Sequence, residues 1–179
     1  MTLRFAVYRQ DHPEPSVTHP TPIRWLTRWR STSENLDTSD RNSPRFSDEL
    51  ADLAFAALDH AIDSVRDGGP LIPFVMADGA EGRTLQRFAA VTLEQGLGEA
   101  VVSVRARRDE PGTRHALAYD GYLTVDGSRS DAIYVEAVEP GNDEVMVLAQ
   151  RYRPKKALRK FETVGRPALV PEESAKLTG

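Results

Sequence analysis

The chain has 179 residues, of which 40% are hydrophobic and 28% charged, and its formal net charge is −4 at pH 7. These values predict one soluble globular domain with an extension, and they argue against a surface built throughout for nucleic acid. The chain contains no cysteine, which excludes disulfides, thiol catalysis and zinc–thiolate sites.

No apolar run approaches the roughly 18–20 residues of a membrane span. The first seven residues, Met-Thr-Leu-Arg-Phe-Ala-Val, lack the apolar core and cleavage site of a signal peptide, so a cytoplasmic location is expected. Arg strongly outnumbers Lys among the cations, a bias that favours a GC-rich bacterial source.

Residues 1–46 differ in composition from the rest of the chain. They hold five of the 12 prolines and two serine-rich stretches. Such a segment interrupts helices and strands and buries little apolar surface. We expect residues 1–46 to form a poorly ordered or partly docked N-terminal arm.

The first expected element is an amphipathic helix that begins after Ser47. Ser47 is a suitable N-cap, acidic residues fill the first turn, and apolar residues then recur at intervals of three and four until Gly68-Gly69-Pro70 ends the helix. Next comes a hairpin of two short strands, 71–77 and 83–89. Thr92 with Gln95 resembles a capping box and predicts a second helix to about residue 108.

Four strands are expected after the second helix, at 114–125, 131–139, 144–153 and 158–164. The sequence therefore predicts an α+β fold with an antiparallel sheet, in the order α-β-β-α-β-β-β-β, with both helices packed on one face. Residues 47–170 would form the single domain, and residues 171–179 would form a loose tail.

The pairing of the first two long strands was predicted from their alternation. A three-residue loop, 127–129, places Tyr122 opposite Tyr134 and Asp120 opposite Glu136, with Leu123 opposite Ile133. One sheet face would then carry the polar residues Asp120, Tyr122, Thr124, Tyr134 and Glu136, joined by Gln150 and Tyr152.

Two functions follow from this polar face. Tyr122, Tyr134, Gln150 and Tyr152 would form an interaction face, because tyrosine buries well while keeping a polar tip. We therefore expect a non-enzymatic protein-interaction module, most simply a homodimer with an unknown protein partner. The alternative is a small enzyme in which Asp120 and Glu136 act as an acid/base pair or hold a divalent cation. An ordinary solvated face of an antiparallel sheet explains the same two carboxylates and is favoured for them. No spacing of residues predicts a bound metal or a cofactor.

A basic segment supports a third hypothesis. The six cations of residues 151–160 have no acidic residue among them: Arg151, Arg153, Lys155, Lys156, Arg159 and Lys160. Cations beside aromatic residues suit a phosphate backbone, so an anion or nucleic-acid binder is the second alternative. A solvated turn whose lysines deter edge-to-edge aggregation explains the same pattern and is favoured, so neither a nucleic-acid nor a membrane partner is expected.

Overall fold

The structure is a computed structural model, and it describes residues 45–172 and 175–178. Its elements in chain order are α1 (Asp48–Arg66), β1 (Phe74–Gly79), β2 (Gly82–Arg87), α2 (Leu93–Arg105), β3 (Arg114–Val125), β4 (Ser128–Val138), β5 (Met146–Arg153) and β6 (Glu162–Leu169). The predicted α+β class and order of elements are confirmed. The expected N-terminal arm lies almost entirely outside the described residues.

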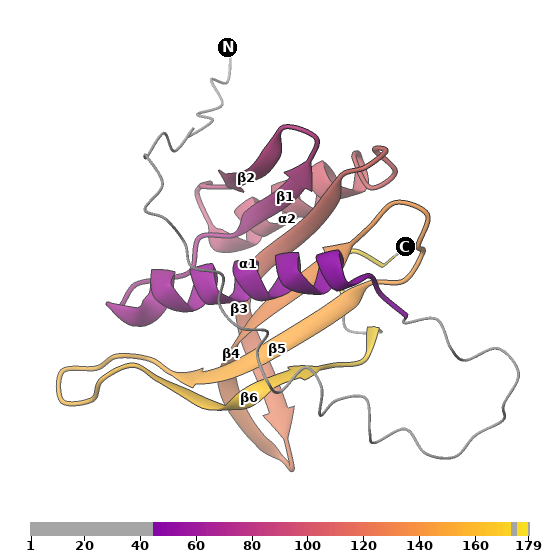
Figure 1. The fold of residues 1–179 in the computed structure, drawn as a ribbon. Coiled ribbons are helices and arrows are strands. Elements are labelled where there is room, and N and C mark those ends of the chain that lie inside the picture. Colours follow the sequence, from indigo (N-terminus) through magenta and orange to yellow (C-terminus); the bar gives the residue numbers. More distant parts are fainter. Residues whose placement is uncertain (1–44, 173–174, 179) are drawn as a thin grey trace, which may run out of the picture. The chain divides into compact units, whose positions relative to one another are not determined.

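The six strands form one antiparallel sheet in the order β2-β1-β3-β4-β5-β6 (Figure 1). Only the connection between β2 and β3 is a crossover, and α2 lies within it. Because β2 and β6 are the edge strands, the middle of the sheet consists of β1, β3, β4 and β5. In the part of the chain that the structure describes, no helix is long and apolar enough to cross a membrane.

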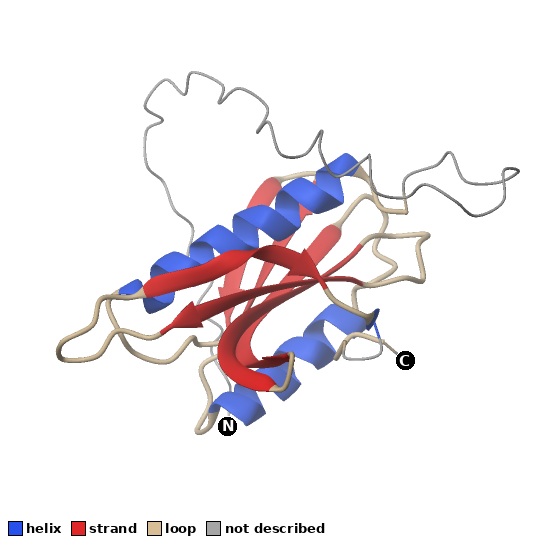
Figure 2. Ribbon diagram, turned by 90° about the horizontal axis from the view of Figure 1, so that it is seen from below, coloured by secondary structure: helices blue, strands red, loops and turns tan. Residues whose placement is uncertain are grey.

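The two helices cover opposite faces of the sheet, which corrects the prediction that both lie on one face (Figure 2). Neighbouring residues of β1 show the division, because Phe74 and Met76 pack with α1 whereas Val75 packs with α2. The last seven residues of β4 are all buried. A central strand that is apolar on both sides needs a cover on both sides, and one helix cannot supply it.

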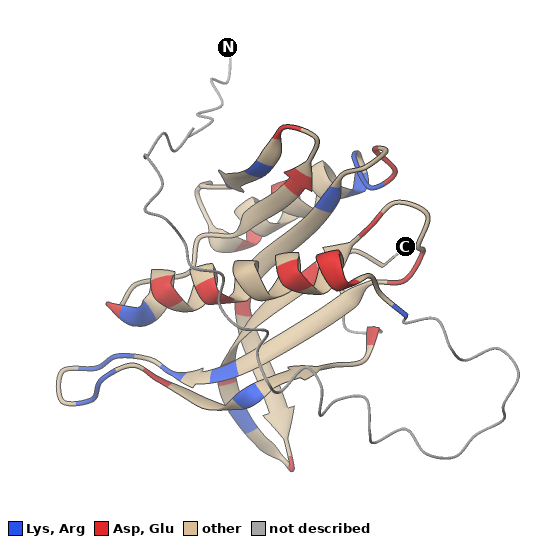
Figure 3. Ribbon diagram, viewed as in Figure 1, with Lys and Arg blue, Asp and Glu red and all other residues tan. Residues whose placement is uncertain are grey.

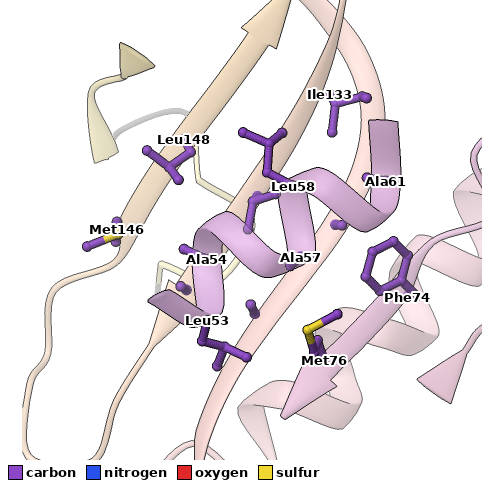
Figure 4. Close-up of a cluster of buried hydrophobic side chains, with 14 of the residues drawn as sticks. Leu53, Ala54, Ala57, Leu58, Ala61, Phe74, Met76, Ile133, Met146 and Leu148 are labelled. Carbon is purple, nitrogen blue, oxygen red and sulfur yellow. The ribbon is translucent and has the colours of Figure 1, made fainter. Parts of the chain in front are cut away.

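The core beneath α1 begins at the helix cap. The hydroxyl oxygen of Ser47 accepts a hydrogen bond from the Leu50 N–H at 3.1 Å, and the same hydroxyl donates to the Glu139 carboxylate at 2.5 Å. This fixes the start of α1 against the end of β4. Small and large apolar residues of α1 then pack on the sheet, with Leu58 near Ile133 (Figure 4).

The core beneath α2 depends on one close approach. A Cβ on Gly96 would lie 2.3 Å from the Phe88 carbonyl oxygen, so only glycine permits this distance between the helix and the chain before it. The same core contains Leu177, which is 1% exposed. Described residues 175–178 are therefore docked on the domain, which corrects the prediction of a loose tail.

The β3–β4 hairpin turns on two residues, Asp126 and Gly127, both with positive φ (50° and 74°). This is the usual conformation of a tight Asp-Gly hairpin turn. The pairing is shifted by three residues from the predicted one, because Asp120 lies opposite Ile133 and Glu136 opposite Leu117. An odd shift turns every side chain of one strand to the other face, so the predicted register is wrong.

Candidate functional site

The register divides the residues predicted to share a polar face. Asp120, Tyr122, Gln150 and Tyr152 lie on the face covered by α1, whereas Tyr134 and Glu136 lie on the face covered by α2. Asp120 and Glu136 are therefore on opposite sides of the sheet. The structure does not bring them together as an acid/base pair, and it does not join the three tyrosines in one interaction face.

The first group lies on the face covered by α1. The Tyr152 hydroxyl donates a hydrogen bond of 3.0 Å to the carboxylate of Asp120, and Arg129 lies 3.8 Å over the Tyr122 ring. Partial desolvation raises the pKa of Asp120, although the hydrogen bonds from Tyr152 and the Gly121 N–H oppose this. Tyr152 is only 6% exposed and Tyr122 is 60% exposed, so Tyr122 is the one tyrosine of this group that offers a contact surface, beside the exposed Asp120.

Gln150 has a structural role that explains its burial. The pairing of β5 with β6 is irregular between Ala149 and Arg151. The Gln150 amide donates to the main-chain carbonyls of Arg151 at 2.8 Å and Val164 at 3.1 Å. Its side chain thus supplies hydrogen bonds at a bulge, and it is 2% exposed and unavailable to a partner.

On the other face, the buried Glu136 binds the C-terminal segment. Its carboxylate accepts main-chain N–H bonds from Lys176 and Leu177, each at 2.8 Å, and a 2.5 Å bond from the Tyr119 hydroxyl. Glu136 is 0% exposed. A fully buried carboxylate is costly unless it is hydrogen-bonded, and here the donors come largely from the tail.

Two arginines from α2 and the loop after it bind the carbonyls of the same segment. Arg105 donates to the carbonyls of Lys176 and Thr178 at 2.8 and 2.7 Å. Arg108 donates to the Leu177 carbonyl at 3.3 Å, and also to carbonyls of the β4–β5 loop. We call Glu136, Arg105 and Arg108, with the apolar residues around Leu177, the tail site.

Two tyrosines pack beneath the tail site. The rings of Tyr119 and Tyr134 are stacked at 5.5 Å, and the Tyr134 hydroxyl donates to the Tyr122 carbonyl at 2.9 Å. Burial, followed by the negative charge of Glu136, raises the pKa of Tyr119, so its phenol stays protonated and remains a donor. Tyr134 is therefore a support of this site and not part of an exposed face.

The tail site binds the main chain of residues 176–178 with charged side chains of both signs. Glu136 accepts from two successive N–H groups, and the arginines donate to the carbonyls of a segment that bends at residues 176 and 177, so a short bent peptide is the ligand that this arrangement suits. Sequence reasoning missed Arg105, Arg108, Tyr119 and Leu177. One available signal was Glu136 itself, the lone charge in the apolar run from Ala132 to Val138.

The basic segment is located in the loop between β5 and β6. Arg153 pairs with Glu162 at 2.9 Å, and the Lys155 ammonium contacts the main-chain carbonyl of Asp67 at 3.3 Å. The loop is folded back on itself, which is why β6 begins at residue 162 and not near 158 as predicted. Arg151 precedes the loop on β5 and is partly buried.

Comparisons do not assign this site. No protein-family model, no curated protein and no solved structure matches the chain. Among residues 45–172 and 175–178, no three His, Asp or Glu side chains are grouped as metal ligands.

Proposed function

We propose that the chain is a non-enzymatic protein-interaction module that binds a short, bent peptide segment at the tail site. The observation that supports this is the way in which residues 175–178 are held. Their N–H and carbonyl groups are bound by Glu136, Arg105 and Arg108, and one side chain, Leu177, is buried.

Such contacts are transferable between chains. Main-chain hydrogen bonds supply affinity without demanding a particular sequence, and a buried side chain supplies selectivity. The segment that fits therefore needs two successive N–H groups facing Glu136 and a leucine-sized residue beside them. The chain's own tail meets both requirements.

A second copy of the chain is the simplest partner. Each copy carries one tail site and one segment that fits it, so reciprocal exchange of tails produces a symmetric homodimer. The contacts at each site would be the same as in the monomer. This mechanism replaces the tyrosine face as the basis of the expected homodimer.

A labelled peptide tests the capacity of the site. The probe is fluorescein-labelled Pro-Glu-Glu-Ser-Ala-Lys-Leu-Thr-Gly, which corresponds to residues 171–179. In the full chain carrying Leu177→Ser, the internal tail loses its apolar anchor, and fluorescence anisotropy should show saturable binding of the probe. The wild type should bind it more weakly, because its own tail competes. Adding Glu136→Gln to the Leu177→Ser chain should abolish binding.

Two altered probes serve as matched controls. A peptide with serine in place of Leu177 should not bind. One with alanine in place of Lys176 should bind only slightly more weakly, since Lys176 contributes mainly its main-chain N–H and its ammonium lies 5.9 Å from the centre of the Tyr119 ring. If the Leu177→Ser chain keeps its near-ultraviolet circular dichroism and binds no probe, the tail site is not a peptide-binding site.

Light scattering tests the identity of the partner separately. Tail exchange predicts a dimer fraction that grows with protein concentration and is lost in Leu177→Ser. A wild type that remains monomeric while the peptide binds would exclude the second copy and point to another protein with a leucine-bearing segment.

A further inference from the structure

The loop between β5 and β6 is a hairpin with an apolar tip. The main chains of Lys156 and Arg159 exchange two hydrogen bonds, at 2.9 and 3.1 Å, so Ala157 and Leu158 form the turn between them. Leu158 is fully exposed. We call residues 153–162 the basic hairpin.

Cations surround this tip on the side toward the sheet. Lys156 and Arg159 flank the turn, and Lys155 and Lys160 lie one residue further from it, all of them exposed. The carboxylate of Glu162, at the base of the hairpin, is paired with Arg153. Figure 3 shows this basic loop extending beyond the sheet, while acidic residues lie on α1 and on turns and loops elsewhere in the molecule.

We propose that the basic hairpin docks the chain on an anionic lipid surface. Leu158 enters the boundary between headgroups and acyl chains, and Lys156 and Lys160 contact the anionic headgroups. Lys155 and Arg159 add positive charge nearby while donating to the carbonyls of Asp67 and Pro154. An apolar side chain ahead of a ring of cations matches the layers of such a surface, which is apolar within and negatively charged outside. The chain would lie on the membrane without crossing it.

A lipid surface explains the hairpin better than a nucleic acid does. Single-stranded nucleic acid is bound largely by stacking of bases on aromatic rings. The aromatic residues of this region are not available, because Phe161 packs against Tyr152 with ring centroids 5.5 Å apart and Tyr152 is buried. Leucine at the tip has no ring to stack, and it adds nothing to contact with phosphates.

Vesicle sedimentation with the full chain tests the proposal. Vesicles of phosphatidylcholine with 30% phosphatidylserine should bind the wild type at low salt, and pure phosphatidylcholine should not. Leu158→Ser should weaken binding by about tenfold or more, from the loss of its buried apolar surface. Lys156→Gln and Lys160→Gln should each weaken it by about fivefold, and added salt should weaken it further.

Val91→Ser is the matched control. Val91 is 92% exposed but lies in the loop before α2, away from the basic hairpin, so this variant should bind vesicles like the wild type. Failure of the wild type to bind anionic vesicles at low salt would overturn the proposal. So would equal binding by Leu158→Ser, or binding of single-stranded oligonucleotides that exceeds binding of vesicles and is unaffected by Leu158→Ser.

Discussion

The docking of residues 175–178 as one unit makes a quantitative prediction about paired substitutions. Leu177 is 1% exposed, and truncation of a buried leucine to alanine costs about 2–5 kcal/mol in a core that cannot move away. We expect the tail to undock while the rest of the domain stays folded, which limits the loss of stability to the free energy of docking. We expect Leu177→Ala to lower the free energy of unfolding by about 2 kcal/mol, the lower end of that range.

Glu136→Gln weakens the same docked unit by changing the carboxylate that accepts the N–H groups of Lys176 and Leu177. It removes charge-assisted hydrogen bonds of about 1.5–3 kcal/mol each, and the amide turns donors toward the N–H groups of residues 176 and 177. Removal of a buried charge offsets part of this loss. A net loss of about 1–2 kcal/mol is therefore expected for the single substitution.

The double variant, Leu177→Ala with Glu136→Gln, shows whether residues 175–178 dock as one unit or through independent contacts. Once one substitution has released the tail, the other has little left to remove, so the double variant should lose about as much as the more damaging single one, which is a coupling of about 1 kcal/mol or more. Urea unfolding of the four proteins measures this, with hydrogen exchange of the Leu177 amide as a local readout. Losses that add to within about 0.5 kcal/mol would refute docking as a unit.

Two further predictions concern the packing of side chains under α1 and the pH dependence of the free energy of unfolding. Ile133→Ala should lower the free energy of unfolding by about 2–5 kcal/mol, because Ile133 is 0% exposed under α1. Ile62→Ala should lower it less than half as much, because Ile62 is only partly buried. Urea unfolding that gives equal losses for the two variants would contradict the observed packing. Burial, and after it the positive charge of Arg107, lowers the pKa of His115 despite the opposing charge of Glu110. As pH falls through about 6.5, the unfolded chain therefore takes up this proton before the folded one does. The free energy of unfolding decreases below that pH. His115→Leu should therefore be more favourable relative to wild type at pH 5 than at pH 7.5, and parallel pH profiles of the free energy of unfolding would argue against this assignment.

Local signals were enough to predict the elements. Ser47 caps α1 and Thr92 caps α2, each through a hydrogen bond spanning three residues. The two partners of a helix-capping interaction lie within a few residues of each other, so the sequence pattern alone identifies both. The Asp126-Gly127 pair is also a local signal for the two-residue loop that the structure contains, but the prediction of a three-residue loop set this signal aside.

The predicted register was wrong because alternation was treated as evidence for one buried face. β4 is buried on both faces, so its side chains do not alternate between apolar and polar, and the pairing of Tyr122 with Tyr134 had no physical basis in the pattern. Leu123 was expected opposite Ile133 for the same reason, and it is only partly buried on the other face. The helix on the second face was the missing information.

The tail site was decided by the tertiary structure alone. Glu136 and the Lys176 N–H that it binds are 40 residues apart in the chain, and Arg105 is 71 residues from Lys176. No periodicity or turn signal relates positions so distant, because they meet only when α2 closes the second face of the sheet. Local patterns in the sequence specify the helices, the strands and the run of cations at 151–160. The face on which each residue lies depends on packing across the whole sheet, and so does the use of a buried carboxylate to hold the tail.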